Sequence, residues 1–304
     1  MVLIFFFLNN MKLAPIVLFV YRRVEHTKKT VKALLSNELA NKSKLIIFSD
    51  GWRGEEDYDD VKDVRNYLYT ISGFDTVEII ESPINKGLAK SVIEGVTKVV
   101  NEYGNIIVLE DDIVVSQYFL NYMNEALNLY YGNKINIMHI NGYFFQHYKN
   151  LPNYFLCGYM LCWGWATWKD SWKNFSYDVD KHLEVLDGWY FKKNMYIKTA
   201  LSTLKANKLG KISTWAAFWQ ASITENKGLC LTPDISYTIN IGHDGTGENS
   251  LENNLFDVNL NNQYIPIKVE SIKESKKAIG IIGCLLKKSR GSFLQRIIRR
   301  IKNL

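Results

Sequence analysis

The first half of the chain alternates short apolar runs with longer stretches in which apolar residues recur every three or four positions. The short runs predict buried strands, and the longer stretches predict helices with one apolar face. Strands are expected at 14–21, 44–49, 77–81 and 105–110. Helices are expected between them, with apolar positions spaced through 31–39, 61–71 and 89–99. Because strands that alternate with helices form a mostly parallel sheet covered by helices, the predicted fold class is α/β.

The second half of the chain has a different pattern. The alternation fades, and seven of the eight tryptophans lie between Trp163 and Trp219. This pattern predicts a mixed α+β region laid against the edge of the sheet. We therefore expect two halves of one domain, residues 1–142 and 143–265, followed by a tail at 266–304.

The tail carries the positive charge. The whole chain sums to +6, whereas residues 266–304 hold eleven Lys or Arg and two Glu, which gives +9 and leaves −3 for the rest. A body without net positive charge argues against a nucleic-acid partner. In the tail, Phe293, Ile297 and Ile301 fall on one face of a basic helix, which predicts contact with an anionic membrane surface. Packing of that helix on the protein body, or a dimer contact, fits the same pattern.

Cysteine usage and the amino terminus bear on location. The four cysteines show no Cys-x-x-Cys spacing, so free thiols in a reducing cytoplasm are expected rather than a zinc or redox site. Residues 1–8 are apolar but too few to span a membrane, and they lack the basic start of a signal peptide. Either Met1 or Met11 fits as the first residue. We expect a cytoplasmic protein, peripheral at the inner face of the cell membrane if its tail binds there.

Three adjacent acids, Glu110, Asp111 and Asp112, end the fourth predicted strand. Carboxylates crowded at the end of a buried strand repel one another and lose hydration. A divalent cation such as Mn or Mg removes that cost, because carboxylate oxygens are suitable ligands and the metal can also bind a diphosphate. We therefore predict a metal site here. A solvated acidic turn is the alternative.

Polar residues also follow the first two strands, at the edge where open α/β sheets bind ligands. Asp50 comes directly after the second strand and can accept hydrogen bonds from a base or ribose, or serve as a turn residue. Tyr21 and Arg22 end the first strand. They add hydrogen-bond donors to the same edge, or they are solvated.

The turn before the third predicted helix adds an anion-binding signal. Asn85, Gly87 and Lys90 lie where this helix begins. A helix start favours an anion, a glycine lets the backbone approach a ligand closely, and Lys90 can meet a phosphate. A glycine-containing helix entry with exposed lysines is the alternative.

Four segments, in this order, resemble the donor-binding half of glycosyltransferases with the GT-A fold. They are Phe-Val-Tyr-Arg-Arg at 19–23, Phe-Ser-Asp-Gly at 48–51, Asn-Lys-Gly-Leu-Ala at 85–89 and Leu-Glu-Asp-Asp at 109–112. The chain looks most like bacterial proteins similar to N-acetylglucosaminyltransferase I, among family 2-like sugar transferases. Residues 163–168 resemble the acceptor-side Gly-Trp segment of that family. Residues 233–238 with 242–247 resemble the loop that orders over the bound donor.

The resemblance implies a Rossmann-like GT-A fold with a donor half at 1–142 and an acceptor-side half at 143–265. It implies a nucleotide-sugar donor, in particular a UDP-sugar, with a Mn or Mg ion held by Asp112. Glu110 and Asp111 would contact the sugar and ribose of the donor. The implied reaction inverts the anomeric centre and transfers the sugar to a glycan or lipid-linked acceptor, in surface polysaccharide or lipopolysaccharide synthesis.

The general base is where the chain departs from the family. An Asp follows the first Trp of the family's Trp-Asp-x-x-Trp segment, whereas Ala216 holds that position here. An alanine cannot take the proton from an acceptor hydroxyl. Asp170, beside the tryptophans, and Asp244, in the loop, are the candidate bases, although each also fits a surface or turn position. The tryptophans themselves predict mainly core packing, with one or two facing the cleft.

Two other functions fit part of the pattern. A sugar nucleotidyltransferase has a similar sheet and acidic metal site, but that class usually opens with a Gly-rich loop where this chain has Tyr21 and Arg22. A non-catalytic nucleotide-sugar or glycan-binding module stays open because of Ala216. A dinucleotide dehydrogenase is disfavoured, since no Gly-x-Gly-x-x-Gly follows the first strand.

Overall fold

The computed structural model describes residues 12–132, 134–188, 194–243 and 256–289. In this part of the chain, one large sheet has the strand order β3-β2-β1-β4-β8-β6-β9-β7. Its strands are β1 Ile16–Val20, β2 Lys44–Ser49, β3 Thr76–Glu81, β4 Asn105–Glu110, β6 Ile137–Asn141, β7 Tyr154–Cys157, β8 Trp165–Trp168 and β9 Leu229–Pro233. Two short strands, β5 Ile113–Val115 and β10 Thr238–Asn240, pair separately and antiparallel.

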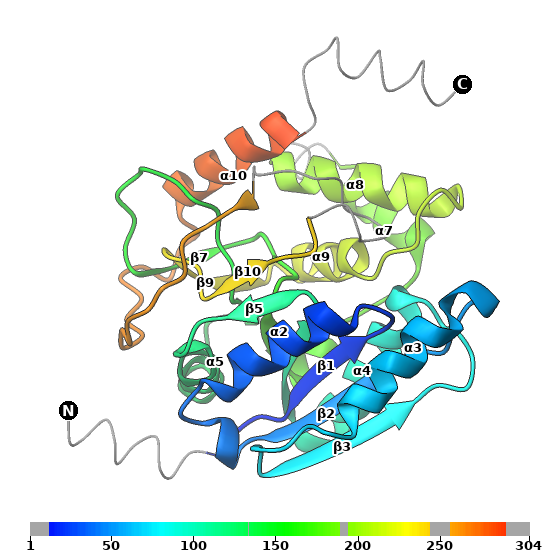
Figure 1. Ribbon diagram of the computed structural model, residues 1–304. Coiled ribbons are helices and arrows are strands. Elements are labelled where there is room, and N and C mark those ends of the chain that lie inside the picture. Colours follow the sequence, from blue (N-terminus) through cyan, green and yellow to red (C-terminus); the bar gives the residue numbers. More distant parts are fainter. Residues whose placement is uncertain (1–11, 133, 189–193, 244–255, 290–304) are drawn as a thin grey trace.

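The first four strands of the chain confirm the predicted α/β fold. β1 lies between β2 and β4, β3 flanks β2, and all of these pairs are parallel. Helices connect them in alternation (Figure 1). The described helices are α2 Val24–Leu35, α3 Glu55–Leu68, α4 Leu88–Tyr103, α5 Phe119–Leu129, α6 Lys169–Trp172, α7 Val179–Leu186, α8 Met195–Lys208, α9 Ala216–Glu225 and α10 Lys276–Ser289, with a 3-10 turn η1 at Ala40–Lys42.

Helices cover both faces of the parallel strands, which explains why these strands are apolar runs rather than alternating ones. Successive residues of β1 point to opposite faces. Val17 packs in the same core as Val92 and Val96 of α4. Leu18 packs in the core that contains Leu34 of α2. All five residues of β1 are therefore buried, and the strand is held between two apolar layers.

The second half of the chain extends the same sheet. β8 pairs antiparallel with β4, and β6, β9 and β7 follow it outward. Helices α7, α8 and α9 pack against one another beyond these strands (Figure 1). The predicted mixed α+β region thus contributes strands of its own to the sheet that carries the first half.

The described part of the tail packs on the protein. Helix α10 contacts α8, and its residues Ala278 and Ile282 are fully buried. The apolar residues of this stretch thus serve the protein core. The basic amphipathic helix predicted around Phe293–Ile301 lies outside the described residues. Among the residues that are described, none of the helices combines the length and the apolar character that a membrane crossing requires.

Candidate functional site

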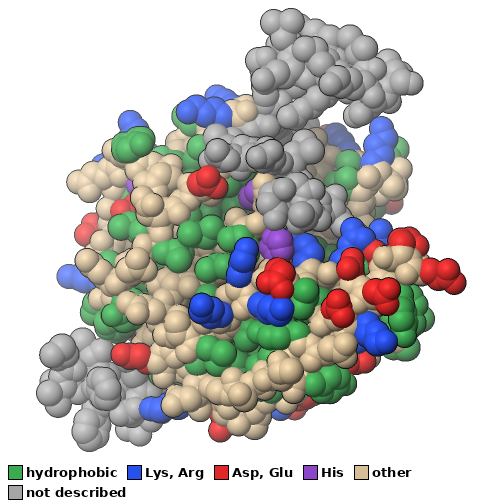
Figure 2. Space-filling view, in the orientation of Figure 1, with side chains coloured by type: hydrophobic (Ala, Val, Ile, Leu, Met, Phe, Trp, Pro, Cys, Tyr) green, Lys and Arg blue, Asp and Glu red, His purple; other side chains and the backbone are tan. Residues whose placement is uncertain are grey.

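The carboxyl ends of β1, β2 and β4 meet at one cavity of about 340 Å³. Tyr21, Arg22 and Arg23 follow β1, Asp50 follows β2, and the acids at 110–112 end β4. The amino end of α4 and the start of α9 complete the lining. Acidic and basic side chains gather side by side over this edge of the molecule, next to a histidine (Figure 2). The sequence prediction that these segments share one site is consistent with this geometry.

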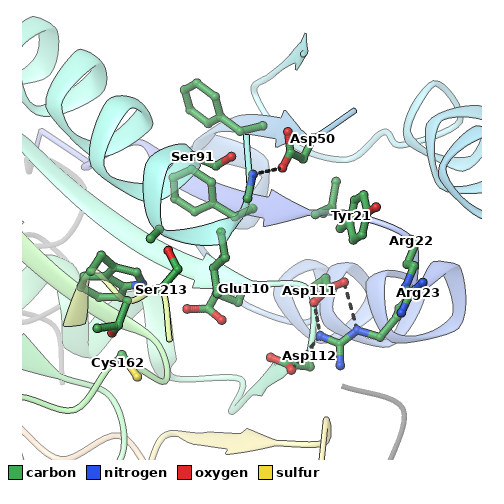
Figure 3. A pocket seen from close by; sticks show the side chains of 18 of the residues that line it. Tyr21, Arg22, Arg23, Asp50, Ser91, Glu110, Asp111, Asp112, Cys162 and Ser213 are labelled. Atoms are coloured by element: carbon green, nitrogen blue, oxygen red, sulfur yellow. Dashed lines mark hydrogen bonds and ion pairs between the residues drawn. The ribbon is translucent and has the colours of Figure 1, made fainter. Parts of the chain in front are cut away.

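Asp50 holds the turn that leads into α4. Its Oδ1 accepts hydrogen bonds from the backbone N–H groups of Gly51 and Lys86, both at 2.9 Å. Its Oδ2 accepts one from Gly87 N at 2.9 Å (Figure 3). Asn85 Nδ2 in turn donates to Gly51 O at 2.8 Å. Asp50 is therefore committed to ordering the 85–87 turn, while its position in the cavity lining keeps it beside any bound ligand.

Gly87 presents an open backbone to the cavity. It has φ 74° and ψ 156°, a conformation that other residues adopt at a substantial cost. A Cβ added at this position would meet no described atom within 4 Å. Gly87 caps α4, so the first backbone N–H groups of this helix face the same space. This arrangement suits an anion such as a phosphate.

Two acids of the triplet, Glu110 and Asp111, have strongly perturbed pKa values. Burial raises the pKa of Glu110 to about 8, and the charges of Asp112 and Asp111 act in the same direction. Burial likewise raises the pKa of Asp111 to about 6, although Arg23 acts to lower it. In Figure 3 the Glu110 side chain points away from Arg23, toward the side of the cavity where Ser213 and Cys162 lie. Such crowding of buried acids is costly unless a cation balances it.

Arg23 supplies part of that balance. Its Nη2 donates to Asp111 Oδ1 at 2.5 Å and to Asp112 Oδ2 at 2.8 Å. Asp112 Oδ1 is buried and has no hydrogen-bond partner among the described residues, and the same is true of His243 Nε2. Both residues line the cavity. A carboxylate oxygen and an imidazole nitrogen left unpaired in one polar cavity fit a divalent cation.

The described residues contain no ready-made cluster of three or more metal-ligating side chains. A divalent cation at a phosphate site does not need one. Mg typically takes one or two carboxylates from the protein and completes its shell with substrate phosphates and water. Asp112, with His243 as a second ligand, therefore fits a metal that arrives with a nucleotide.

Tyr21 and Arg22 line the cavity, but both are also tied to α3. The Tyr21 hydroxyl donates to Asp57 Oδ2 at 2.6 Å, and Arg22 Nη1 pairs with Asp57 Oδ1. Burial and the Asp57 carboxylate raise the pKa of Tyr21 to about 12. Lys90 departs from the sequence prediction. It is exposed, lies 3.8 Å from Glu94 of its own helix, and is not part of the cavity lining.

The predicted base Asp170 lies at the wrong end of the sheet. β8 runs antiparallel to β4, so Trp168 pairs with Asn105 at the amino end of β4. The acids lie at the other end, about 17 Å away at 3.3 Å per residue. Asp170 follows Trp168 on the surface, where its side chain is 79% exposed and pairs with Lys173. This position contradicts a role for Asp170 in chemistry at the cavity.

The side of the cavity that faces the strand ends is formed by residues 213–216 with Trp163. Ala216 begins α9 and lines the cavity where the family resemblance predicts a base. The described acids in the lining all come from the strand ends on the opposite side. Asp244, the other predicted base, lies outside the described residues, directly after His243.

The tryptophans divide as the sequence predicts. Most of them are core residues, and Trp165 and Trp219 are at most 1% exposed. Trp163 and Trp215 also line the cavity. Trp163 contacts the His243 ring edge-on, with the ring centres 5.2 Å apart. Among the described tryptophans, these two therefore border the cavity.

Gly242 is a site residue that the sequence alone does not single out. A Cβ at this position would lie 2.2 Å from Asp112 Oδ2 and 2.9 Å from Arg23 Nη1. The Gly242 backbone therefore packs directly on the Asp112–Arg23 pair. Its neighbour Ile241 donates its N–H to Asp112 O at 2.9 Å. The only sequence signal is the position of Gly242 in the segment that resembles the donor loop.

Comparison with known proteins finds similarity among solved structures alone. No protein-family model matches the chain, and no curated protein matches it. Among solved structures, the chain is similar to the mannosyltransferase PcManGT from Pyrobaculum calidifontis in complex with GDP-Man and Mn2+, with 9% identity and a TM-score of 0.40 over 71% of this chain and 72% of that one. It is also similar to S. aureus TarS, with 7% identity and a TM-score of 0.40 over 74% of this chain and 36% of that one.

A third similar structure is 4-diphosphocytidyl-2C-methyl-D-erythritol synthase from Anaerococcus prevotii, with 7% identity and a TM-score of 0.39 over 76% of this chain and 92% of that one. The three proteins have different activities, and similarity at this level carries no argument about function. The α/β class with a mostly parallel sheet and flanking helices is shown by the strand order itself.

Proposed function

We propose that the chain is a glycosyltransferase that binds a nucleotide sugar and a divalent cation at the edge formed by β1, β2 and β4. The observation that carries the proposal is the unpaired, buried Asp112 Oδ1 in the same cavity as the open amino end of α4. A carboxylate oxygen is a ligand that a divalent cation prefers, and the amides at a helix start favour an anion. A nucleoside diphosphate with its cation satisfies both.

The roles of the protein groups follow from their positions. Asp112, with His243, would hold Mn or Mg, and the metal would stabilise the charge that develops on the leaving diphosphate. The amides of α4 that follow Gly87 would bind phosphate oxygens, because the Gly87 N–H already donates to Asp50. Asp50 would fix the turn that presents those amides. Trp163 and Trp215 would bound the space for the sugars.

The finer assignments rest on the family resemblance. It favours a UDP-sugar, an inverting transfer and an acceptor that is a glycan or a lipid-linked glycan of a surface polysaccharide. With Asp170 excluded by its position, Asp244 is the proposed base. An Asp244→Asn variant should then lose turnover by at least about a hundredfold, the contribution typical of a general base, with donor affinity retained. Normal turnover in that variant would remove Asp244 from this role.

The test of the whole proposal is calorimetric binding of a panel of UDP- and GDP-sugars with Mn and with a chelator. Asp112→Asn should abolish the Mn-dependent part of binding. Asp170→Asn is the matched control, because it makes the same chemical change on an exposed helix far from the cavity. Equal binding by the two variants, or binding that ignores Mn, would reject the site.

A second candidate function is a nucleotide-sugar-binding module without transfer activity. Ala216 favours it, because no acid of the described lining lies on the acceptor side. The two functions separate in one assay. Mn-dependent donor binding combined with slow hydrolysis of the donor supports the enzyme, whereas binding with no release of free sugar supports the module.

A further inference from the structure

A second cavity, of about 260 Å³, adjoins the first. The two share Cys162, Trp163, Thr214 and Ala216 in their linings, so the second begins where the acceptor side of the first ends. Its further lining comes from α8, α9, Leu286 of α10 and the residues before Cys162. The alanine that replaces the expected acid therefore stands at the junction of the two cavities.

The lining of the second cavity is mainly apolar and aromatic. It includes Phe145, Met160, Leu161, Ala200, Phe256 and Leu286. Two of its larger polar side chains, Gln220 and Tyr196, are already bonded within the protein. Gln220 Nε2 donates to Gly158 O at 2.8 Å, and Gln220 Oε1 accepts from Met160 N at 2.9 Å. The Tyr196 hydroxyl donates to Glu274 at 3.1 Å.

The wall between the two cavities is the divider segment, residues 158–163, which has no regular secondary structure. Buried side chains satisfy its backbone groups. Asn141 Oδ1 accepts from Leu161 N at 2.7 Å, and Asn141 Nδ2 donates to Tyr159 O at 3.1 Å. A ring nitrogen of the fully buried His139 lies 3.2 Å from Leu161 O. With Gln220, these residues fix the divider, so the second cavity is built into the fold before any ligand binds.

We infer that the second cavity receives an apolar group carried by the acceptor. This inference rests on the proposed function, in which the acceptor hydroxyl must reach the donor sugar. The strand ends and α4 occupy the donor side, so the acceptor approaches past Thr214 and Ala216. The part of the acceptor next to its reacting sugar then lies at the mouth of the second cavity.

The chemistry of the lining selects an apolar occupant over a second sugar. A sugar ring would lose the hydrogen bonds that its hydroxyls make to water, and this mainly apolar lining, in which Gln220 and Tyr196 are already engaged, offers few groups to replace them. An apolar group loses nothing of this kind and gains from leaving water. An apolar cavity of about 150 Å³ holds benzene, so about 260 Å³ suits a larger group, such as a short stretch of alkyl chain.

The probes for this inference are methyl, butyl and hexyl β-D-glucopyranoside. Their binding to the full chain is measured by calorimetry in the presence of Mn and UDP. Affinity should rise about fourfold for each methylene that enters the cavity. Binding of a nucleotide sugar with Mn is measured on the same preparation, so that the donor site is tested separately.

Two substitutions fill the cavity from α8. Ala200→Phe places a ring where a buried alanine lines the second cavity only, and Thr203→Met is a milder change at a half-buried lining residue. Both should remove the dependence on chain length and leave donor binding unchanged. Ser202→Phe, on the exposed side of the same helix, is the control and should behave as wild type. If Ala200→Phe fails to fold, Thr203→Met carries the test.

The outcomes separate the two proposals. Normal donor binding with no effect of alkyl length overturns this inference and leaves the proposed function standing. Chain-length dependence that survives in Thr203→Met or Ala200→Phe also overturns it, because the alkyl group then binds elsewhere. Failure of the wild-type protein to bind any nucleotide sugar overturns the proposed function, and the acceptor role of the cavity with it.

Discussion

Replacement of Gly87 by Ala tests the anion site at the amino end of α4. At φ 74° and ψ 156° Gly87 occupies a region that is essentially restricted to glycine. Its added Cβ would meet no described atom within 4 Å, so the cost is torsional rather than steric. Holding Ala in this conformation costs about 1–3 kcal/mol.

Relaxation of the backbone at Gly87 would also cost free energy. Rotation away from the observed conformation would break the hydrogen bond from Gly87 N to the Asp50 carboxylate, and a bond to a charged group contributes about 1.5–3 kcal/mol. The torsional cost and the cost of the lost hydrogen bond are similar. The free energy of unfolding should therefore fall by about 1–3 kcal/mol whether the alanine keeps the observed conformation or rotates away from it. Each kcal/mol lowers the melting temperature by roughly 2–4 °C in a domain of this size class. Donor affinity should fall at least about tenfold, because the new methyl group occupies the space in front of the helix amides.

Gly104→Ala is the matched control. Gly104 ends the same helix at φ 86° and ψ −23°, and its Cβ would also meet no described atom within 4 Å. It should lose about 1–2 kcal/mol of stability through left-handed strain. Because it lies at the far end of α4, its affinity for a nucleotide sugar should be unchanged in calorimetry. Equal loss of donor affinity in both variants, or none in Gly87→Ala, would refute the assignment of an anion to this helix end.

Three further predictions concern other parts of the site and its support. Gly242→Ala should displace the Asp112–Arg23 pair, because the added Cβ would clash with both side chains. Mn-dependent donor binding should then weaken at least about tenfold, and the cause is this steric clash rather than torsional strain of the backbone. Asn141→Leu should leave two backbone groups of the divider segment without partners and cost about 2–6 kcal/mol in urea unfolding. His182 donates to Glu225 and to a backbone carbonyl; burial acts to lower its pKa, but these hydrogen bonds prevail and raise it. Because the folded pKa exceeds the unfolded value of about 6.5, the stability that this pair adds is complete below that pH and declines as the pH rises through the folded pKa. Wild type and His182→Gln should therefore converge in stability as the pH rises above the folded pKa.

The parts of the fold that could be predicted from sequence are those encoded locally. β1 and β4 are runs of apolar residues buried on both faces, and α4 repeats its apolar residues at helical spacing. Parallel strands joined by helices then have their carboxyl ends at one edge. The acids after β4 and the residues after β1 and β2 were therefore expected to lie together, and they line one cavity.

What could not be predicted depends on strand direction and on contacts between distant segments. Asp170 follows a tryptophan-rich segment that does line the cavity at Trp163, but the chain runs away from the acids along the antiparallel β8. Sequence proximity to the tryptophans therefore indicated the wrong end of the sheet. Lys90 lies only three residues after Gly87, yet on α4 it turns outward to Glu94. The approach of Gly242 to Asp112 joins segments about 130 residues apart, which no local pattern reveals.

The charges of the acidic triplet and Arg23 favour a divalent cation. Full ionisation of Glu110, Asp111 and Asp112 would place three negative charges at one strand end, and Arg23 offsets one of them. The two that remain equal the charge of one divalent cation. Burial and the neighbouring carboxylates raise the pKa values of Glu110 and Asp111, and a cation bound beside them would act to lower both. Arg23 uses only Oδ2 of Asp112, so Oδ1 stays available and a metal can bind without displacing the arginine. In the proposed function, Arg23 therefore orders the two aspartates and leaves Asp112 Oδ1 for a metal that would bind together with the diphosphate.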